Sequence, residues 1–192
     1  NEVGVVRAIE ARQAPIAHLD NYLEGLEADD SPIRNADAAT RAAQLVKHLD
    51  ERKIAALAKA TRAAGVSVVP TMALWETFHS ADSGEALLEK RPEVKYLPRE
   101  WVEGYVKQKN GMAAKGNVLG LAPSLSVPEI RKRILKGLRD AGVRIVFGTD
   151  SPQLFSVPGF SIHREIPILA AAGMTPYEIL QSGTRNVADY FG

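Results

Sequence analysis

The strongest indication of fold in this sequence is VRIVFGTDSP, residues 143–152. Val143 to Phe147 are rich in β-branched and aromatic side chains, and Gly148 follows them directly. An apolar run that ends at glycine is typical of a buried strand, so we expect a strand near residues 143–148. Asp150 then lies on the loop at the carboxyl end of this strand. Barrels of the α/β class carry their catalytic residues at that end of their strands.

Two other short apolar runs lead to a polar residue in the same way. The sequence predicts strands near residues 14–18 and 66–70, which place His18 and Thr71 at their carboxyl ends. Helical patterns that stop at glycine separate the predicted strands. Apolar strands that alternate with helices indicate a parallel sheet covered by helices. We therefore expect His18, Thr71 and Asp150 at one edge of such a sheet.

Two pairs of capping residues predict helix starts in the second half of the chain. Ser126 with Glu129, and Thr175 with Glu178, have the Ser/Thr-x-x-Glu spacing of a capping box. We expect both pairs to open helices. A basic run in the first of these helices, residues 131–133, is expected on a solvated face.

The composition limits the classes of protein that fit. The chain has 192 residues, 45% of them hydrophobic, so residues 1–192 can bury a substantial core. Its 24 basic and 23 acidic residues give a net charge of +1, and we expect no binding to nucleic acid or to a membrane. The chain has no cysteine, which excludes disulfides and thiolate metal sites. With no membrane span and no targeting segment in sight, we expect a soluble protein and favour the cytoplasm.

The last fifty or so residues resemble the carboxyl end of the amidohydrolase superfamily, and within it the imidazolonepropionase-related and prolidase-like branch. The resemblance is carried by the following segments: residues 141–152 (AGVRIVFGTDSP), 159–165 (GFSIHRE), 172–180 (AGMTPYEIL) and 183–188 (GTRNVA). Upstream, residues 16–19 (IAHL) resemble the sixth strand of the family with its histidine, and residues 68–71 (VVPT) resemble the seventh. Thr149 and Asp150 resemble the end of the eighth.

The resemblance implies a metal-dependent hydrolase on a (β/α)8 barrel of the TIM type. One or two divalent ions, with zinc as the expected metal, would activate water for attack on an amide or related bond. The four histidines of this chain stand at 18, 48, 79 and 163, so the family's His-x-His pair and its strand-five histidine are absent. We therefore expect an α/β fold that forms the C-terminal part of the barrel, about three βα units holding strands six to eight. A missing N-terminal barrel segment or a partner chain would supply the other ligands, and the chain alone would be inactive.

The resemblance assigns Asp150 and His18 to both catalysis and metal binding. A carboxylate beside the metal can take the proton of the attacking water and pass it to the leaving amine. Asp150 alternatively forms hydrogen bonds within its own turn, as aspartate readily does. His18 would bind metal or polarise the substrate carbonyl, or else it is a partly buried histidine that a neighbouring residue satisfies.

Other residues are candidates for substrate binding. Thr71 follows the second predicted strand and His163 follows the Asp150 loop, although a strand-end role and a surface position fit them equally well. Trp75, Phe78 and His79 are expected on an irregular excursion after Thr71, where long loops form lids and pockets, or where aromatic side chains anchor the loop. The expected substrates are dipeptides, cyclic amides or similar small molecules.

A second class of function stays open at this point. The chain could be a noncatalytic α/β module or an assembly subunit, because it lacks most of a metal site. Three parallel strands leave two unpaired edges, which a partner segment would cover, and a homo-oligomer would provide one such partner.

Overall fold

The computed structural model describes residues 3–116, 118 and 124–192. Helices make up 59% of it, and its described part holds one sheet of two short parallel strands. β1 (Ile16–Ala17) pairs with β2 (Val68–Val69), with Ile16 opposite Val68 and Ala17 opposite Val69. The expected α/β fold, three βα units from the C-terminal part of a (β/α)8 barrel, is therefore wrong. The protein is mostly helical.

The segment 143–148 lies beside β2 without forming the predicted strand. Its contact with β2 is a single parallel bridge, Val68 to Ile145. The Val68 N–H donates to the Arg144 carbonyl at 3.0 Å, and the Val146 N–H donates to the Val68 carbonyl at 2.8 Å. The pairing stops there because the next donor would be Pro70, which has no N–H, and because the Val66 N–H donates to the Thr61 carbonyl. The opposite edge of the segment is bonded to two C-terminal helices.

The helices follow one another with short connections. The N-terminal half contains α1 (Val5–Glu10), α2 (Tyr22–Gly25), α3 (Ala38–Gln44), the 3-10 helix η1 (Leu45–His48) and α4 (Lys53–Ala63). The middle contains α5 (Met72–His79), α6 (Gly84–Glu89), the 3-10 helix η2 (Pro92–Tyr96) and α7 (Arg99–Lys115). The remainder contains α8 (Ser126–Asp140), α9 (Ser161–Ala171), α10 (Pro176–Ser182) and α11 (Arg185–Phe191). No helix of the described part has both the length and the apolar character needed to cross a membrane.

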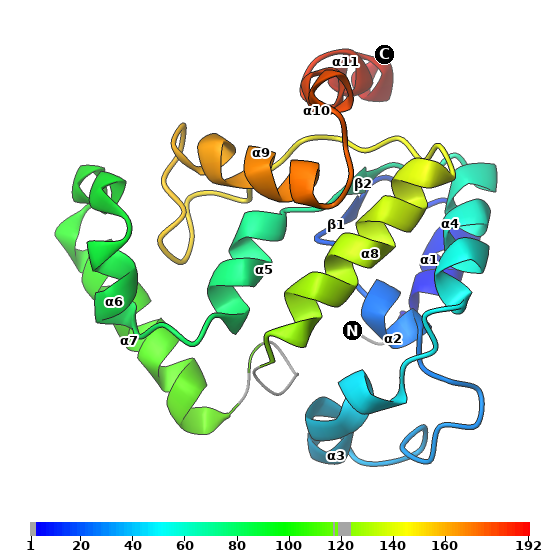
Figure 1. Cartoon of the computed structure of the whole chain (residues 1–192), viewed down its shortest axis with the longest axis horizontal. Coiled ribbons are helices and arrows are strands. Elements are labelled where there is room, and N and C mark those ends of the chain that lie inside the picture. Colours follow the sequence, from blue (N-terminus) through cyan, green and yellow to red (C-terminus); the bar gives the residue numbers. More distant parts are fainter. Residues whose placement is uncertain (1–2, 117, 119–123) are drawn as a thin grey trace.

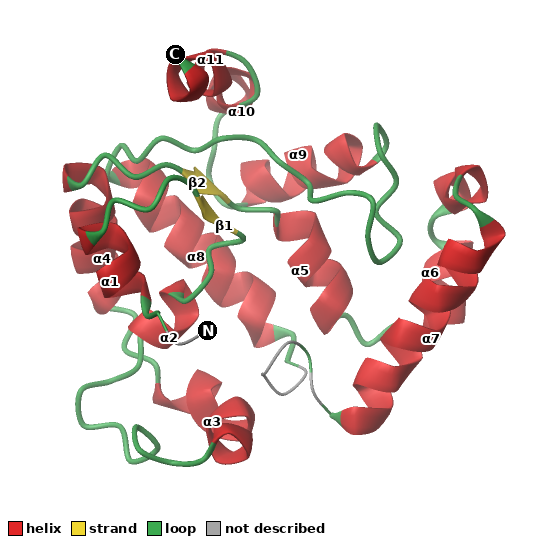
Figure 2. Ribbon diagram, turned by 180° about the vertical axis from the view of Figure 1, so that it is seen from behind, coloured by secondary structure: helices red, strands yellow, loops and turns green. Residues whose placement is uncertain are grey.

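Helix α8 is central to the packing, since it contacts α4, α5 and α9. Figure 1 shows it crossing the molecule beside the two strands, with α6 and α7 at one side and α10 and α11 together at one end. Figure 2 shows the strands from behind, between α8 and the end of α5 that is nearest to α9. Ile130, Ile134 and Leu138 of α8 are buried, as their helical spacing predicts.

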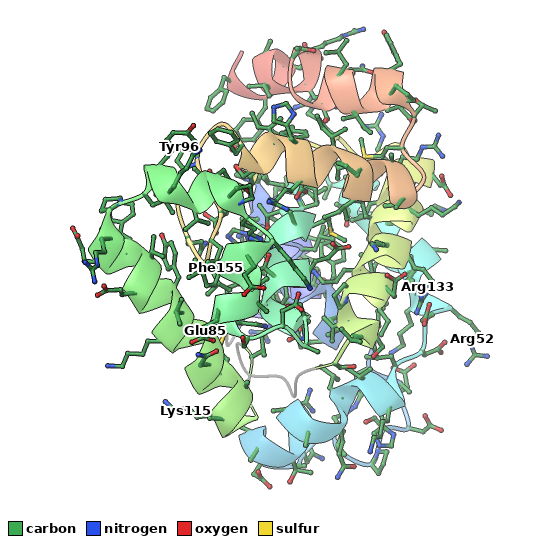
Figure 3. All side chains as sticks on the ribbon, turned by 60° about the vertical axis from the view of Figure 1, so that its left-hand side comes forward. Arg52, Glu85, Tyr96, Lys115, Arg133 and Phe155 are labelled. Carbon is green, nitrogen blue, oxygen red and sulfur yellow. The ribbon has the colours of Figure 1, made fainter. Side chains whose placement is uncertain are left out.

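The hydrophobic core has two parts. The larger cluster joins both strands to helices α1, α4, α8 and α9, and includes Val68, Met72 and Leu135. The smaller cluster lies between α5, α6, α7 and the loop before α9, and Phe155 is fully buried in it (Figure 3). Trp75, Phe78 and His79 lie on the regular helix α5, so the prediction of an irregular excursion for them is wrong.

The two predicted helix starts have different outcomes. Thr175 and Glu178 form the expected capping box: the Glu178 N–H donates to Thr175 Oγ1, and the Thr175 N–H donates to Glu178 Oε2. Helix α8 does begin at Ser126, but its N-cap residue is Leu125, and no side-chain cap bond is present in the described part of this turn. Ser126 Oγ instead bonds to Ser124 Oγ at 2.6 Å.

Candidate functional site

Three residues predicted from the sequence meet beside the short sheet. His18 follows β1, Thr71 follows β2, and Asp150 follows the segment that bridges to β2. The Nδ1 atom of His18 is hydrogen-bonded to Thr71 Oγ1 at 2.8 Å. Its other ring nitrogen, Nε2, lies 3.6 Å from Asp150 Oδ2. The structure therefore brings His18, Thr71 and Asp150 into one constellation, although the strands that lead to them are short or irregular.

All three residues have left-handed backbone conformations. The φ angle is 56° at His18, 46° at Thr71 and 55° at Asp150. For residues other than glycine this conformation costs about 1–3 kcal/mol, so it persists only where the surrounding structure enforces it. Strained residues of this kind cluster at functional sites. Three of them in one constellation mark this place in the molecule as a candidate site.

A cavity of about 590 Å³ opens beside His18 and Asp150. Its wall combines apolar and charged side chains. The apolar ones include Leu74, Trp75 and Phe78, and the polar and charged ones include Asp20, Glu24, Arg131 and Gln153. The His18 side chain is 30% exposed and that of Asp150 is 37% exposed, so water and a small ligand can reach both. The cavity size lies within the range of small-molecule sites.

Hydrogen bonds hold the loop that carries Asp150. Ser161 Oγ, at the start of α9, donates to Thr149 Oγ1 at 2.9 Å and lies 3.2 Å from Ser151 Oγ. Gln153 Nε2 donates to Asp150 Oδ2. The turn is thus fixed by its hydroxyl groups and by Gln153. The Asp150 carboxylate is bonded within the turn, to Gln153, and it also lies near the His18 ring.

The other two substrate-binding candidates lie in different surroundings. Thr71 is 1% exposed, and its hydroxyl contacts His18, so its place is behind the imidazole. His163 lies on an exposed part of α9 and is not among the residues that line the cavity in the described structure. Trp75 and Phe78 do line the cavity, from one face of α5.

A buried arginine forms part of the cavity wall behind His18. Arg131 is 2% exposed, its guanidinium lies 3.8 Å from the centre of the Trp75 ring, and its Nη2 donates to the His18 carbonyl. Burial lowers the pKa of Arg131 to about 9, which leaves it charged at neutral pH. The expected solvated face for residues 131–133 is therefore wrong at Arg131. Arg133, on the outer side of α8 (Figure 3), pairs instead with Glu51.

A buried carboxylate lies on the other side of Thr71. Glu165 of α9 is 0% exposed and accepts hydrogen bonds from the Met72 and Ala73 amides, each at 2.7 Å. Burial raises the pKa of Glu165 to about 7, against the effect of these two bonds. Neither Glu165 nor Arg131 is among the site residues predicted from the sequence. Each has helical spacing with buried neighbours, Ser161 and Leu169 for Glu165, and Val127 and Ile134 for Arg131, and this spacing is the signal that predicts burial.

His18 and Asp150 have the geometry of two ligands of one metal ion. Two ligand atoms of a tetrahedral zinc ion lie roughly 3.3–3.5 Å apart when their bonds to the metal are about 2.0–2.2 Å. The observed separation is 3.6 Å. The second ring nitrogen of His18 is hydrogen-bonded to Thr71, as in most metal-binding histidines. Across the described residues no group of three or more such ligands occurs, so at this place the described structure offers His18 and Asp150.

No protein-family model, curated protein or solved structure matches this chain. The resemblance to amidohydrolases thus rests on the quoted sequence segments alone.

Proposed function

We propose that this chain contributes the His18–Asp150 part of a hydrolytic site for amide or peptide-like C–N bonds in small molecules. The observation that carries the proposal is the approach of His18 Nε2 to Asp150 Oδ2, at 3.6 Å, on the wall of a 590 Å³ cavity. Both residues have strained backbone conformations, and a hydrogen bond fixes the histidine ring from behind.

In this proposal Asp150 handles the proton. Its carboxylate accepts the proton of the attacking water and returns it to the leaving amine nitrogen, which is general base and then general acid catalysis by one group. Gln153, which donates to Oδ2, helps to fix the orientation of the carboxylate. His18 directs Nε2 toward the same space, where it can hold an ion or polarise the substrate carbonyl.

His18 Nε2 and Asp150 Oδ2 would also hold a divalent metal ion, for which zinc is our proposal. Such an ion supplies Lewis-acid activation of water and of the substrate carbonyl. Catalytic zinc sites use three protein ligands or more. We therefore propose that a further polypeptide segment or a partner chain completes the ligand set.

The cavity favours a small substrate with an apolar part. Leu74, Trp75 and Phe78 form an apolar wall from α5, while charged side chains of both signs border the opening. Small-molecule sites combine such apolar walls with a few polar groups that orient the ligand. Dipeptides and cyclic amides have both kinds of surface, and we propose these as the substrate class.

The test compares Asp150→Asn with Asp189→Asn, an exposed aspartate on α11 outside the cavity lining. Both variants are made in the complete protein, in which the further segment or partner chain supplies the remaining ligands, and a panel of dipeptides and cyclic amides is assayed with Zn²⁺, Co²⁺ or Mn²⁺ present. Removing a general base costs about 10²- to 10⁴-fold in rate, so Asp150→Asn should lose turnover by that factor and Asp189→Asn should not. Equal rates in Asp150→Asn and the wild type, or no turnover of any panel member by the wild type, would contradict the proposal.

A further inference from the structure

The start of helix α5 is built differently from other capped helices in this chain. At three helix starts the N-cap residue is extended, with φ and ψ of −62° and 162° at Asp37, −70° and 167° at Ser83, and −71° and 158° at Thr175. Each of these side chains accepts a hydrogen bond from a backbone amide of its own helix. This is the usual way to satisfy the free amides of the first turn.

Thr71, the N-cap residue of α5, departs from this geometry. Its φ and ψ are 46° and 49°, and it makes no side-chain cap bond in the described structure of this turn. The Thr71 hydroxyl is hydrogen-bonded instead to Nδ1 of His18, at 2.8 Å. Threonine is a good capping residue. Here its hydroxyl bonds to the histidine ring rather than accepting hydrogen bonds from the first-turn amides of α5.

Glu165 satisfies the amides that Thr71 leaves free. One carboxylate oxygen accepts from the Met72 amide and the other from the Ala73 amide, both at 2.7 Å. Glu165 comes from α9, far along the chain, and is completely buried. A negative charge at this position is also favourable for the positive end of the α5 dipole.

We propose that Glu165 is a positioning residue for His18. By capping α5 in place of Thr71, it keeps Thr71 in the left-handed conformation and its hydroxyl on His18 Nδ1, so that Nε2 faces Asp150. Without Glu165, the Met72 and Ala73 amides are buried without an acceptor, which costs about 1–3 kcal/mol for each such group. The Thr71 hydroxyl is the nearest replacement in sequence. It reaches these amides only if Thr71 takes the extended conformation, and it then releases His18.

The test uses three variants of the whole chain and one matched control. Glu165→Gln keeps the shape of the side chain but accepts with one oxygen only. Thr71→Val removes the hydroxyl and keeps the volume, whereas Thr71→Ser retains a hydroxyl and should restore the wild-type result. The control is Glu178→Gln, because Glu178 also caps a helix with its carboxylate, at α10, and its capping partner Thr175 has no contact with His18.

The first readout is the tautomer of the His18 ring, measured by ¹⁵N NMR above the pH range in which histidine titrates. A His18→Gln variant assigns the signal. The Thr71 hydroxyl can donate or accept, whereas the Asp150 carboxylate near Nε2 can only accept, so we expect the Nε2–H tautomer, with Nδ1 accepting from Thr71, in the wild type, Thr71→Ser and Glu178→Gln. Glu165→Gln and Thr71→Val, in which Nδ1 loses this donor, should show a mixture of both tautomers. Urea unfolding of the same samples should show lower stability for both Glu165→Gln and Glu178→Gln.

The second readout is turnover by the complete protein, in which the further segment or partner chain supplies the remaining ligands, and only this readout rests on the proposed function. Loss of a group that orients a ligand histidine typically costs about 10- to 100-fold, so kcat should fall by that factor in Glu165→Gln with KM nearly unchanged. If no variant and no wild-type sample turns over substrate, the proposed function fails while the tautomer result still decides the role of Glu165.

Three results would overturn the inference. The first is an unchanged His18 tautomer in a folded Glu165→Gln protein, which would leave Glu165 a purely structural cap. The second is an unchanged tautomer in Thr71→Val, which remains informative if Glu165→Gln does not fold. The third is a wild-type His18 ring that already samples both tautomers equally.

Discussion

The two ends of helix α5 are both capped by a buried charged side chain from a distant helix, but they differ in what the cap leaves free. At the N-terminal end, Glu165 accepts from two backbone amides. At the C-terminal end, Lys109 Nζ from α7 donates to the carbonyls of Thr77, Phe78 and Ser80, at 2.9, 2.9 and 2.7 Å. Each charge has the sign that the helix dipole favours at its end.

The two ends differ because only the N-terminal cap frees the side chain of a neighbouring residue, Thr71, to bond to a residue outside the helix. Glu165 leaves the Thr71 hydroxyl on His18, beside the cavity. Lys109 binds carbonyl groups only, and it does not line the cavity in the described structure. A buried charge at a helix end is therefore not itself an indication of function. The indication is a good capping residue whose own side chain is directed elsewhere.

The largest effect on stability is expected at the C-terminal end. Lys109→Met leaves three carbonyl groups without their donor, and buried groups of this kind cost about 1–3 kcal/mol each, so we expect the free energy of unfolding to fall by roughly 3–5 kcal/mol. Lys107→Met, an exposed position on the same helix, is the control and should change little. Urea unfolding measures both. The His18 tautomer should stay as in the wild type, and a shift in Lys109→Met would break the distinction between the two ends.

A second effect, the dependence of stability on pH, is expected at the N-terminal end of α5, where Glu165 lies. Burial raises the pKa of Glu165 from 4.5 to about 7, with Glu76 adding to the rise and Arg131 opposing it. The folded protein therefore binds this proton more tightly than the unfolded chain. The stability from this group is complete below pH ~4.5 and is lost as the pH rises through about 7, by about 3 kcal/mol in all.

Urea unfolding of the wild type and Glu165→Gln between about pH 4 and pH 8 measures this loss as a difference curve. The difference is needed because His79 has the opposite sign: burial lowers its pKa to about 4, so its contribution is lost as the pH falls. We expect the stability of the wild type relative to Glu165→Gln to decline as the pH rises. A flat difference curve would show that the pKa of Glu165 is the same in the folded protein as in the unfolded chain.

The backbone hydrogen bonds around β2 explain which parts of the structure the sequence predicted correctly. Short apolar runs before His18, Thr71 and Asp150 correctly indicated that these residues converge, because the Val68 backbone pairs with both neighbouring segments. The strand near residues 143–148 was wrong because its partner segment offers no further donor: residue 70 is proline, and the Val66 N–H donates to the Thr61 carbonyl. An apolar run does not show whether the segment beside it has free donors.

Helix α5 shows the same limit for the candidate site. Trp75, Phe78 and His79 have helical spacing, and the capping residue Thr71 precedes them, yet the helix is capped by Glu165 from α9 and not by Thr71. The sequence could place His18 and Asp150 in one site. Helical spacing predicts the burial of Glu165 and Arg131, but it does not show what they contact, which depends on the packing of α9 and α8 against α5.

The smallest effect is expected behind the site, at Arg131. Its planar guanidinium lies over Trp75 and also donates to the His18 carbonyl, and lysine cannot reproduce that planar stacking. A cation–π contact of this kind is worth about 0.5–2 kcal/mol, so Arg131→Lys should lower the free energy of unfolding by about 1 kcal/mol. The control is Arg133→Lys on the same helix, where the partly exposed pair with Glu51 should contribute less than about 0.5 kcal/mol. In a Trp101→Phe background, the fluorescence of Trp75 should shift in Arg131→Lys and not in Arg133→Lys. Equal losses at the two positions would mean that Arg131 adds nothing beyond an ordinary surface charge, and that Thr71 and Glu165 alone hold the N-terminal end of α5 and the histidine beside it.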